Sequence, residues 1–424
     1  MVEFTVRSDR STIANHLRSL VHVLVEVRTP PTAERQRLPL NLGLVIDRSG
    51  SMAGAKLAST RVALRNLLRR LGSEDRVSLV TYDHTVQLLD QGSGAEKQRL
   101  IRKVDELRPG GNTNLSGGWL EGLARVQRGR SAGGLDRVLL LTDGQANAGV
   151  TDRDALAEIG RRHLALGLRT TTLGFGADYD EDLLTQIADE SGGNAYYIET
   201  PDQAAGAFLQ ELGELGDVVG QNLELVVGCE PGVTLIDATD FPGKRDEREA
   251  LFRVGDLYAD DVTCVVLTLS VEPGLAGEQA LLSVGMRYRD VDDGGVERRD
   301  ARLLTVQRQP EPGPVVQDPD VMREVLLHKA ARAKAAAVAL ADRGRLEDAR
   351  TALTRELDSL TQALDEGTVR ISDRELLQSE LTQSRTLRED FREETYSALT
   401  RKQAIMQSHL ARKKRGIYSS RTST

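Results

Sequence analysis

Apolar and polar positions change their period along the chain, and each period predicts a different kind of structure. Between about Leu42 and Leu215, short apolar runs alternate with longer stretches that carry one apolar stripe. This alternation is typical of a doubly wound α/β domain, in which helices cover both faces of a mainly parallel sheet. The predicted strands are residues 42–47, 76–82, 86–89, 137–143, 169–176 and 194–199, and the predicted helices are 56–71, 97–107, 115–127, 153–166 and 181–190.

A period of two replaces this pattern from about Leu223 to Val306. Val284, Met286 and Tyr288 alternate there with polar residues, as they do in antiparallel strands that bury one face. Residues 1–30 follow the same pattern. We therefore predict a small antiparallel β-sandwich whose two halves flank the inserted α/β domain.

Helices are predicted after a proline-rich stretch, which cannot continue a helix or a central strand. Leu353, Leu357, Leu360 and Leu364 recur at helical spacing, and a second apolar stripe runs from Leu376 to Leu399. Both indicate an antiparallel helical hairpin or bundle. The predicted divisions are N-terminal strands at 1–35, the α/β domain at 40–216, the sandwich at 220–308, a linker at 309–320, a helical region at 321–412 and a basic flexible tail at 413–424.

Composition narrows the class of protein. Hydrophobic residues make up 39% and charged residues 28% of the chain, as in soluble globular proteins. Aromatic residues make up only 4%, which argues against a base-stacking surface for nucleic acid. The N-terminus lacks an apolar signal region, and no apolar run approaches the roughly 18 residues that a membrane helix needs. We therefore expect a cytoplasmic protein without a membrane span, in which Cys229 and Cys264 are buried free thiols.

Oxygen-bearing side chains gather where predicted strands end or a helix begins. Asp47, Ser49 and Ser51 follow the first strand, Thr113 precedes the helix at 115, and Asp143 ends the fourth strand. In open α/β sheets, ligands bind beyond these strand ends. Two carboxylates and three hydroxyls suit Mg²⁺ or Mn²⁺, with Ca²⁺ less favoured, whereas zinc would favour nitrogen or sulfur ligands. Neutral hydroxyls leave such an ion with residual positive charge, so a carboxylate from outside is its natural sixth ligand.

The same residues resemble a known site. The phrases DRSGSM, GGNTNL and TDGQAN are similar to the metal-ion-dependent adhesion site of von Willebrand factor type A domains, whose pattern is DxSxS, a distant Thr and a distant Asp. The resemblance covers about residues 40–215. It implies that the two serines and the threonine bind the ion directly or through water, and that the aspartates act largely through water.

The flanking regions resemble, without a sharp motif, bacterial intracellular proteins related to the inter-alpha-trypsin inhibitor heavy chains. That resemblance implies a class of partner, namely AAA-type ATPases of the MoxR group or signalling kinases and phosphatases.

The sequence thus predicts a non-enzymatic module that captures an acidic side chain of a partner protein through a metal ion, with no nucleic-acid partner. Two alternatives stay open. A phosphatase of the haloacid dehalogenase class would also place a metal after Asp47, although it needs a second acid where Ser49 stands. A scaffold could instead act mainly through its C-terminal helices. We expect His84 to be a surface turn residue and Trp119 to be packed inside the domain.

Overall fold

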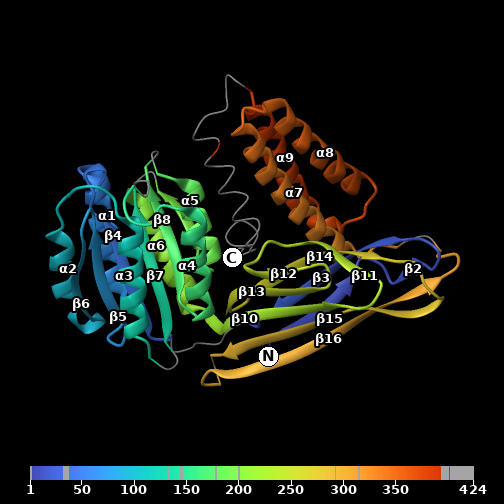
Figure 1. Cartoon of the computed structure of the whole chain (residues 1–424), viewed down its shortest axis with the longest axis horizontal. Helices are drawn as coiled ribbons and strands as arrows, with labels where there is room; N and C mark the ends of the chain where they lie inside the picture. The colour runs from blue at the N-terminus through green and yellow to red at the C-terminus, as the bar shows by residue number, and fades with distance from the viewer. Residues whose placement is uncertain are drawn as a thin grey trace. The chain divides into compact units, whose positions relative to one another are not determined.

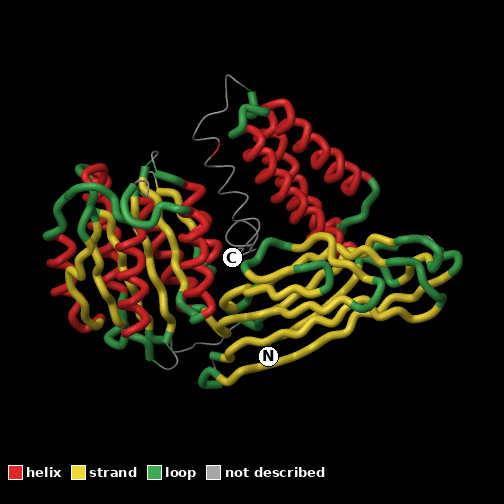
Figure 2. Tube along the Cα trace, viewed as in Figure 1, coloured by secondary structure: helices red, strands yellow, loops and turns green. Residues whose placement is uncertain are grey.

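The structure is a computed structural model, and it describes residues 2–31, 38–131, 134–143, 147–176, 179–198, 201–291, 293–313, 316–392 and 401. The chain divides into two compact units, one of residues 32–222 and 290–296, the other of residues 1–31, 223–289 and 297–424. The predicted tail at 413–424, like Leu399, lies outside the described residues. An α/β sheet forms the first unit, and two β-sheets with C-terminal helices form the second, so the predicted fold class is confirmed (Figures 1 and 2).

A six-stranded sheet in the order β6-β5-β4-β7-β8-β9 forms the centre of the α/β unit. Its strands are β4 (Leu40–Asp47), β5 (Arg76–Tyr82), β6 (Val86–Ser93), β7 (Leu135–Thr142), β8 (Arg169–Phe175) and β9 (Ala195–Ile198). Neighbouring strands pair parallel, except that β6 pairs antiparallel with β5. Every residue of β4, β7 and β8 is buried, because helices cover both faces of these strands.

Helices lie on both sides of this sheet (Figure 1). One side carries α3 (Leu115–Arg128), α4 (Arg153–Ala165) and α5 (Glu181–Glu190), and the other carries α1 (Ala55–Arg70), α2 (Lys97–Asp105) and α6 (Pro201–Gly216). Trp119 is fully buried in the core between α3 and the sheet. Its indole Nε1 donates a hydrogen bond to Thr170 Oγ1 at 2.9 Å. The prediction that Trp119 is packed is therefore confirmed.

Two elements of this unit differ from the sequence-based prediction. The apolar pattern does not predict α6, because Gly206 and Gly213 interrupt it and glycine disfavours a helix interior by about 1 kcal/mol. The pattern also predicts only the first half of β6, since Asp90, Gln91 and Gly92 are polar or small. β6 is an edge strand whose residues stay partly exposed, so it does not need a continuous apolar run.

The second unit contains two sheets, with strand orders β1-β3-β14-β11 and β12-β13-β10-β15-β16-β2. The strands are β1 (Glu3–Ser8), β2 (Thr12–Ala14), β3 (Ser19–Arg28), β10 (Val218–Cys229), β11 (Val233–Ala238), β12 (Gly243–Arg245), β13 (Glu249–Tyr258), β14 (Val262–Val271), β15 (Gly277–Asp290) and β16 (Val296–Gln309). N-terminal strands join later ones, since β3 pairs antiparallel with β14 over its whole length. β2 departs from the predicted antiparallel pattern, because it pairs parallel with β16.

The C-terminal helices pack on one another and on the first sheet. They are α7 (Pro319–Ala341), α8 (Leu346–Asp365) and α9 (Arg374–Asp390), and apolar side chains from all of them form their common core. Val321 and Val325 in the first turns of α7 pack against Leu24 of β3 and Val266 of β14. The start of α7 is therefore anchored on the outer face of that sheet.

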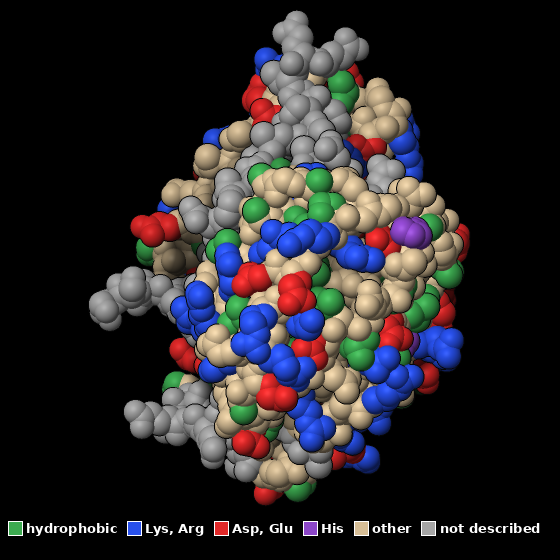
Figure 3. Space-filling view, turned by 90° about the vertical axis from the view of Figure 1, so that its left-hand side faces the viewer, with side chains coloured by type: hydrophobic (Ala, Val, Ile, Leu, Met, Phe, Trp, Pro, Cys, Tyr) green, Lys and Arg blue, Asp and Glu red, His purple; other side chains and the backbone are tan. Residues whose placement is uncertain are grey.

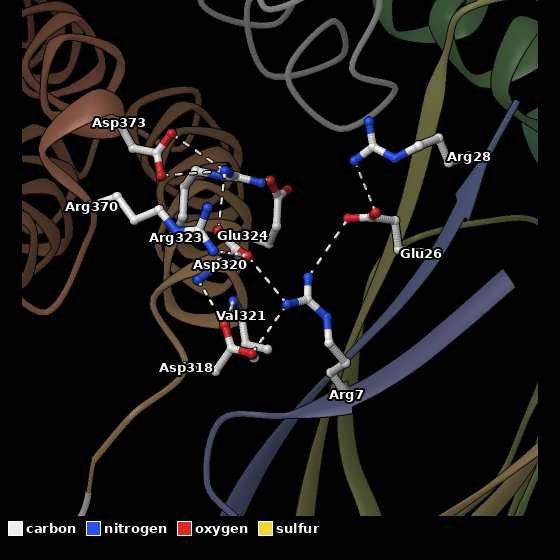
Figure 4. Close-up of polar contacts among 10 residues, drawn as sticks. All are labelled: Arg7, Glu26, Arg28, Asp318, Asp320, Val321, Arg323, Glu324, Arg370 and Asp373. Atoms are coloured by element: carbon white, nitrogen blue, oxygen red, sulfur yellow. Dashed lines mark hydrogen bonds and ion pairs between the residues drawn. The ribbon is translucent and has the colours of Figure 1, made fainter. Parts of the chain in front are cut away.

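Ion pairs reinforce this anchor (Figure 4). Arg7 of β1 donates to Asp318 at 3.1 Å and to Asp320 at 3.2 Å. Asp318 also caps α7, because its carboxylate accepts hydrogen bonds from backbone N–H groups of the first turn. Arg370, in the segment between α8 and α9, donates to the same Asp320 carboxylate at 2.8 Å. These four residues, the Arg7 ion cluster, join a strand of the sandwich to two parts of the helical region.

Charged side chains of both signs cover the end of the α/β unit formed by α2 and β6 (Figure 3). Arg65 pairs with Asp105 at 3.0 Å, and Lys103 pairs with Glu106 at 2.8 Å. Interspersed charges of this kind are typical of a solvated surface.

Two predictions from composition can be compared with the structure. Both cysteines are free thiols, and Cys264 is buried as predicted, whereas Cys229 is only half-buried. Cys229 is the last residue of β10, where burial is less complete. Among the described helices, none has the length and apolar character that crossing a membrane requires.

Candidate metal centre

The strand order brings the ends of β4 and β7 together at one edge of the sheet. The chain leaves β4 toward β5 and β6, and later returns to β7 on the opposite side of β4. The crevice beyond β4 and β7 is therefore the switch point at which open α/β sheets bind ligands. Asp47 is the last residue of β4, and Asp143 directly follows β7. The fold thus places both predicted carboxylates at this crevice.

A chain of hydrogen bonds connects four of the five predicted residues. The Ser49 backbone N–H donates to Asp47 Oδ1 at 2.8 Å, and the Ser49 and Ser51 hydroxyl oxygens lie 3.0 Å apart. The Ser51 hydroxyl donates to Asp143 Oδ1 at 2.8 Å. Asp47, Ser49 and Asp143 are buried, whereas Ser51 is exposed. We refer to these four residues as the oxygen cluster, and Ser51 forms its solvent-facing side.

The loop before α3, which contains Gly110 and Gly111, packs against the serine loop (residues 48–52) and against the turn between β5 and β6. The Gly50 N–H donates to the Gly111 carbonyl at 3.0 Å. A Cβ atom at Gly110 would lie 1.9 Å from Asp83 Oδ2, and one at Gly111 would lie 2.4 Å from His84 Nδ1. A larger residue at these positions would therefore collide with Asp83 or displace the His84 side chain, both in the turn between β5 and β6. The His84 side chain is 64% exposed and lies 3.4 Å from Asp83, which confirms it as a surface residue.

Thr113, the fifth predicted residue, lies on this loop before α3. It is 3% exposed, and its backbone N–H donates to Asn147 Oδ1 at 3.0 Å. Asn114 then caps α3 by accepting a hydrogen bond from the Gly117 N–H at 3.0 Å. Within the described chain, no hydrogen bond joins the Thr113 hydroxyl to the oxygen cluster. The structure therefore places Thr113 on the loop that packs beside the cluster, without a direct link.

Two buried carboxylates, Asp47 and Asp143, lie close together, and a nearby positive charge would stabilise their ionised forms. Burial raises the pKa of Asp47 above its usual value, hydrogen bonds from Thr142 and Ser49 oppose that shift, and the charge of Asp143 adds to it. The Thr142 hydroxyl donates to Asp47 Oδ2 at 2.7 Å. Thr142 therefore positions Asp47, although it is not one of the five residues predicted from the sequence.

Lys56 supplies positive charge to this site, although no motif in the sequence points to it. It is the second residue of α1, and its Nζ donates to Asp143 Oδ2. The Asp143 side chain is fully buried, and that of Lys56 is 29% exposed. The available signal was its place in the first turn of the helix that follows the serine loop.

The donor set fits a hard divalent cation. It offers only oxygen atoms, which Mg²⁺ and Mn²⁺ prefer, and the Lys56 ammonium next to Asp143 is a cation already drawn to the same charge. Across the described ranges, no three or more Cys, His, Asp or Glu side chains gather as a metal cluster. The five predicted residues contain two carboxylates and otherwise depend on hydroxyls, so their role as ligands stays a prediction.

Comparisons with known proteins agree with this architecture. Residues 41–212 match the family model of the von Willebrand factor type A domain. Uncharacterized protein sll0103 of Synechocystis sp. is 28% identical over 314 residues, which cover 71% of this chain and 74% of that protein. Inter-alpha-trypsin inhibitor heavy chain H2 of Sus scrofa is 25% identical over 214 residues, which cover 48% of this chain and 23% of that protein.

A solved structure also shares the fold. The one described as von Willebrand factor type A from Catenulispora acidiphila superimposes with a TM-score of 0.68 at 17% identity, and it covers 87% of this chain and 88% of that one. The similarity therefore extends beyond the α/β unit to the elements that flank it.

Proposed function

Because the chain contains a von Willebrand factor type A domain over residues 41–212, we propose that this domain is a protein-binding module. In this proposal it captures an acidic side chain of a partner protein through a Mg²⁺ or Mn²⁺ ion. The ion would be held by the five predicted residues Asp47, Ser49, Ser51, Thr113 and Asp143. When bound, the ion supplies residual positive charge and a vacant position for an Asp or Glu carboxylate.

The observation that supports the proposal most directly is the convergence of the oxygen cluster at the switch point. Asp47 ends β4, and Asp143 directly follows β7. The hydroxyl of Thr142, next to Asp143, donates to Asp47 across a separation of 95 residues in the sequence. The buried members of the cluster supply negative charge and hydroxyl oxygens. Ser51 stays exposed, so a carboxylate of a partner protein can approach the site from solvent.

The surroundings of Asp47 argue against the phosphatase alternative. A phosphatase of that class needs the carboxylate as a nucleophile, with an oxygen free to attack phosphorus. Asp47 is fully buried, and its two oxygens already accept hydrogen bonds from the Ser49 N–H and the Thr142 hydroxyl. This environment favours a structural or ion-holding role for Asp47, and the absence of a second acid at position 49 favours it further.

The proposed partner is an intracellular protein. Both cysteines are free thiols, as in proteins of a reducing compartment, and this supports a cytoplasmic place of action. The partner class that the family resemblance implies, a MoxR-type AAA ATPase or a signalling kinase or phosphatase, stays part of the proposal. The defining chemistry is an exposed carboxylate that can reach the Ser51 side of the site.

Two measurements test the proposal. In the first, the full chain is titrated calorimetrically with MnCl₂ and MgCl₂. In the second, the Mn²⁺-loaded protein is applied to an array of peptide pairs that differ by one Glu-to-Gln change, before and after EDTA. We expect uptake of the ion, retention of Glu peptides over their Gln partners, and loss of retention in EDTA.

Thr113 provides the matched variants. Thr113→Ala removes the hydroxyl and should weaken both ion uptake and peptide capture, whereas Thr113→Ser keeps the hydroxyl and should retain both. Circular dichroism of the two variants should match the parent, because the Thr113 backbone rather than its hydroxyl makes the bond to Asn147. Peptide capture that is unchanged by EDTA and by the Glu-to-Gln change would refute the proposal.

A further inference from the structure

Lys56 holds one of the two carboxylates that the proposed metal ion needs. Its Nζ donates to Asp143 Oδ2, while Asp143 Oδ1 accepts from the Ser51 hydroxyl. Both oxygens of Asp143 are therefore engaged within the protein. The residues of α1 include no acid, so the positive charge of Lys56 is directed at Asp143 rather than balanced along its own helix.

The position of Lys56 also allows its ammonium to move away from Asp143. Its side chain is 29% exposed, so the ammonium can turn into water without crossing the core. Its Cε and Nζ lie beside Gly176 at the end of β8, where an added Cβ would be 3.0 and 3.4 Å from these two atoms. The absence of a side chain at Gly176 leaves room for the lysine next to the oxygen cluster.

We propose that Lys56 is a built-in competitor of the divalent ion. Its ammonium neutralises Asp143 in the metal-free protein, and it must give up this contact, or remain as a repelling charge, when the ion binds. Lys56 therefore lowers the affinity of the site for Mg²⁺ and Mn²⁺. This inference rests on the proposed metal site and assigns Lys56 as the residue that sets its affinity.

A consequence is coupling between ion and partner. A site that already contains one protein cation holds a divalent ion weakly, and a carboxylate from the partner adds the negative charge that offsets this repulsion. By linkage, a ligand that strengthens ion binding is itself bound more strongly in the presence of the ion. Lys56 thus favours the ternary arrangement over the protein–ion pair alone.

The test compares the parent with four full-length variants in calorimetric titrations with MgCl₂ and MnCl₂. Lys56→Met removes the charge, Lys56→Gln removes the charge but keeps a hydrogen-bond donor for Asp143, and Lys56→Arg keeps the charge. Arg69→Met, in the last turn of the same helix, changes the net charge equally without reaching Asp143. We expect at least about tenfold tighter ion binding for Lys56→Met and Lys56→Gln. Lys56→Arg and Arg69→Met should stay close to the parent.

Thermal unfolding provides an independent readout. In EDTA, Lys56→Met should melt below the parent, because Asp143 loses its counter-charge, and added Mg²⁺ should raise its Tm by more than it raises that of the parent. A variant that gains no affinity, while the parent binds the ion, would overturn the role of Lys56 and leave the metal site standing. If neither the parent nor the charge-free variants take up Mg²⁺ or Mn²⁺, the metal site itself is wrong.

Discussion

Replacing Glu356 by glutamine should stabilise the helical region at neutral and alkaline pH. Glu356 lies in α8 and is only 9% exposed, and its Oε1 is buried without a hydrogen-bond partner in the described residues. Glu380, the acid whose charge acts on Glu356, pairs instead with Lys334 at 2.6 Å. Burial raises the pKa of Glu356 to about 7, Lys329 opposes this shift, and the charge of Glu380 adds to it.

The sign and size of the effect follow from these two states of the carboxyl group. The ordinary pKa is 4.5, so between about pH 4.5 and 7 the folded protein keeps a proton that the unfolded chain releases. The free energy of unfolding therefore falls as pH rises through this window. Each pH unit between the two values is worth about 1.4 kcal/mol, so the ionised group destabilises the fold by about 3–4 kcal/mol above pH 7. Glutamine carries no charge and removes this penalty.

Hydrogen exchange of α8 amides measures the result, because it reports the opening of this helical core separately from the α/β unit. At about pH 8, Glu356→Gln should raise the opening free energy by about 3–4 kcal/mol, and at about pH 5 by much less. The control is Glu347→Gln on the same helix, whose side chain is 84% exposed and which should change little at either pH. An equal gain at both pH values, or no gain, would show that Glu356 is not held as an uncompensated buried acid.

Two further substitutions test the packing of each unit. Gly122→Ala should lower the free energy of unfolding by about 1–3 kcal/mol in chemical denaturation, because its Cβ would lie 2.2 Å from a Val45 methyl carbon. Gly206→Ala is the matched control in α6, where nothing lies within 4 Å of the added Cβ, so it should be neutral or stabilising by up to about 1 kcal/mol. Arg7→Ala should destabilise the anchor of α7 by about 1 kcal/mol or less, since Arg7 is 35% exposed. This loss should shrink in high salt, and a salt-independent loss would indicate packing rather than charge.

Regular apolar patterns made most of the α/β unit predictable from sequence. In α1 the buried Leu57, Leu64, Leu67 and Leu68 fall on one stripe, and the wholly buried β4 and β7 contain the apolar runs LGLVI and VLLL. The edge strand β6 and helix α6 lack such signals, because partial exposure relaxes the need for apolar residues and glycines interrupt the pattern. The parallel pairing of β2 with β16 depends on a contact between distant segments, which local periodicity does not encode.

The residues of the candidate site likewise differ in how far the sequence could predict them. Asp47, Ser49 and Ser51 are close in sequence, and strand ends place them, so their grouping could be predicted. Lys56 could not, because its partner Asp143 is 87 residues away and the contact depends on how α1 leaves the serine loop. The close approach of Gly110 to Asp83 and of Gly111 to His84 likewise appears only in the folded structure. The positions of the motif residues therefore indicate which oxygen atoms gather at the site. The structure adds that the ammonium of Lys56 already pairs with Asp143.

The contacts that shape the site are made by the protein itself. The Arg48 N–H donates to the Tyr82 carbonyl at 2.9 Å, and Gly50 and Asn114 make backbone hydrogen bonds that tie the loops together at 3.0 and 2.9 Å. Because these bonds join main-chain atoms within the α/β unit, their formation does not require an ion, unlike small zinc modules that fold only with metal. An ion in the proposed site would therefore add a binding function to an already folded edge of the sheet. Removing it should abolish capture and spare the fold, which is the property that a reversible, metal-gated contact needs.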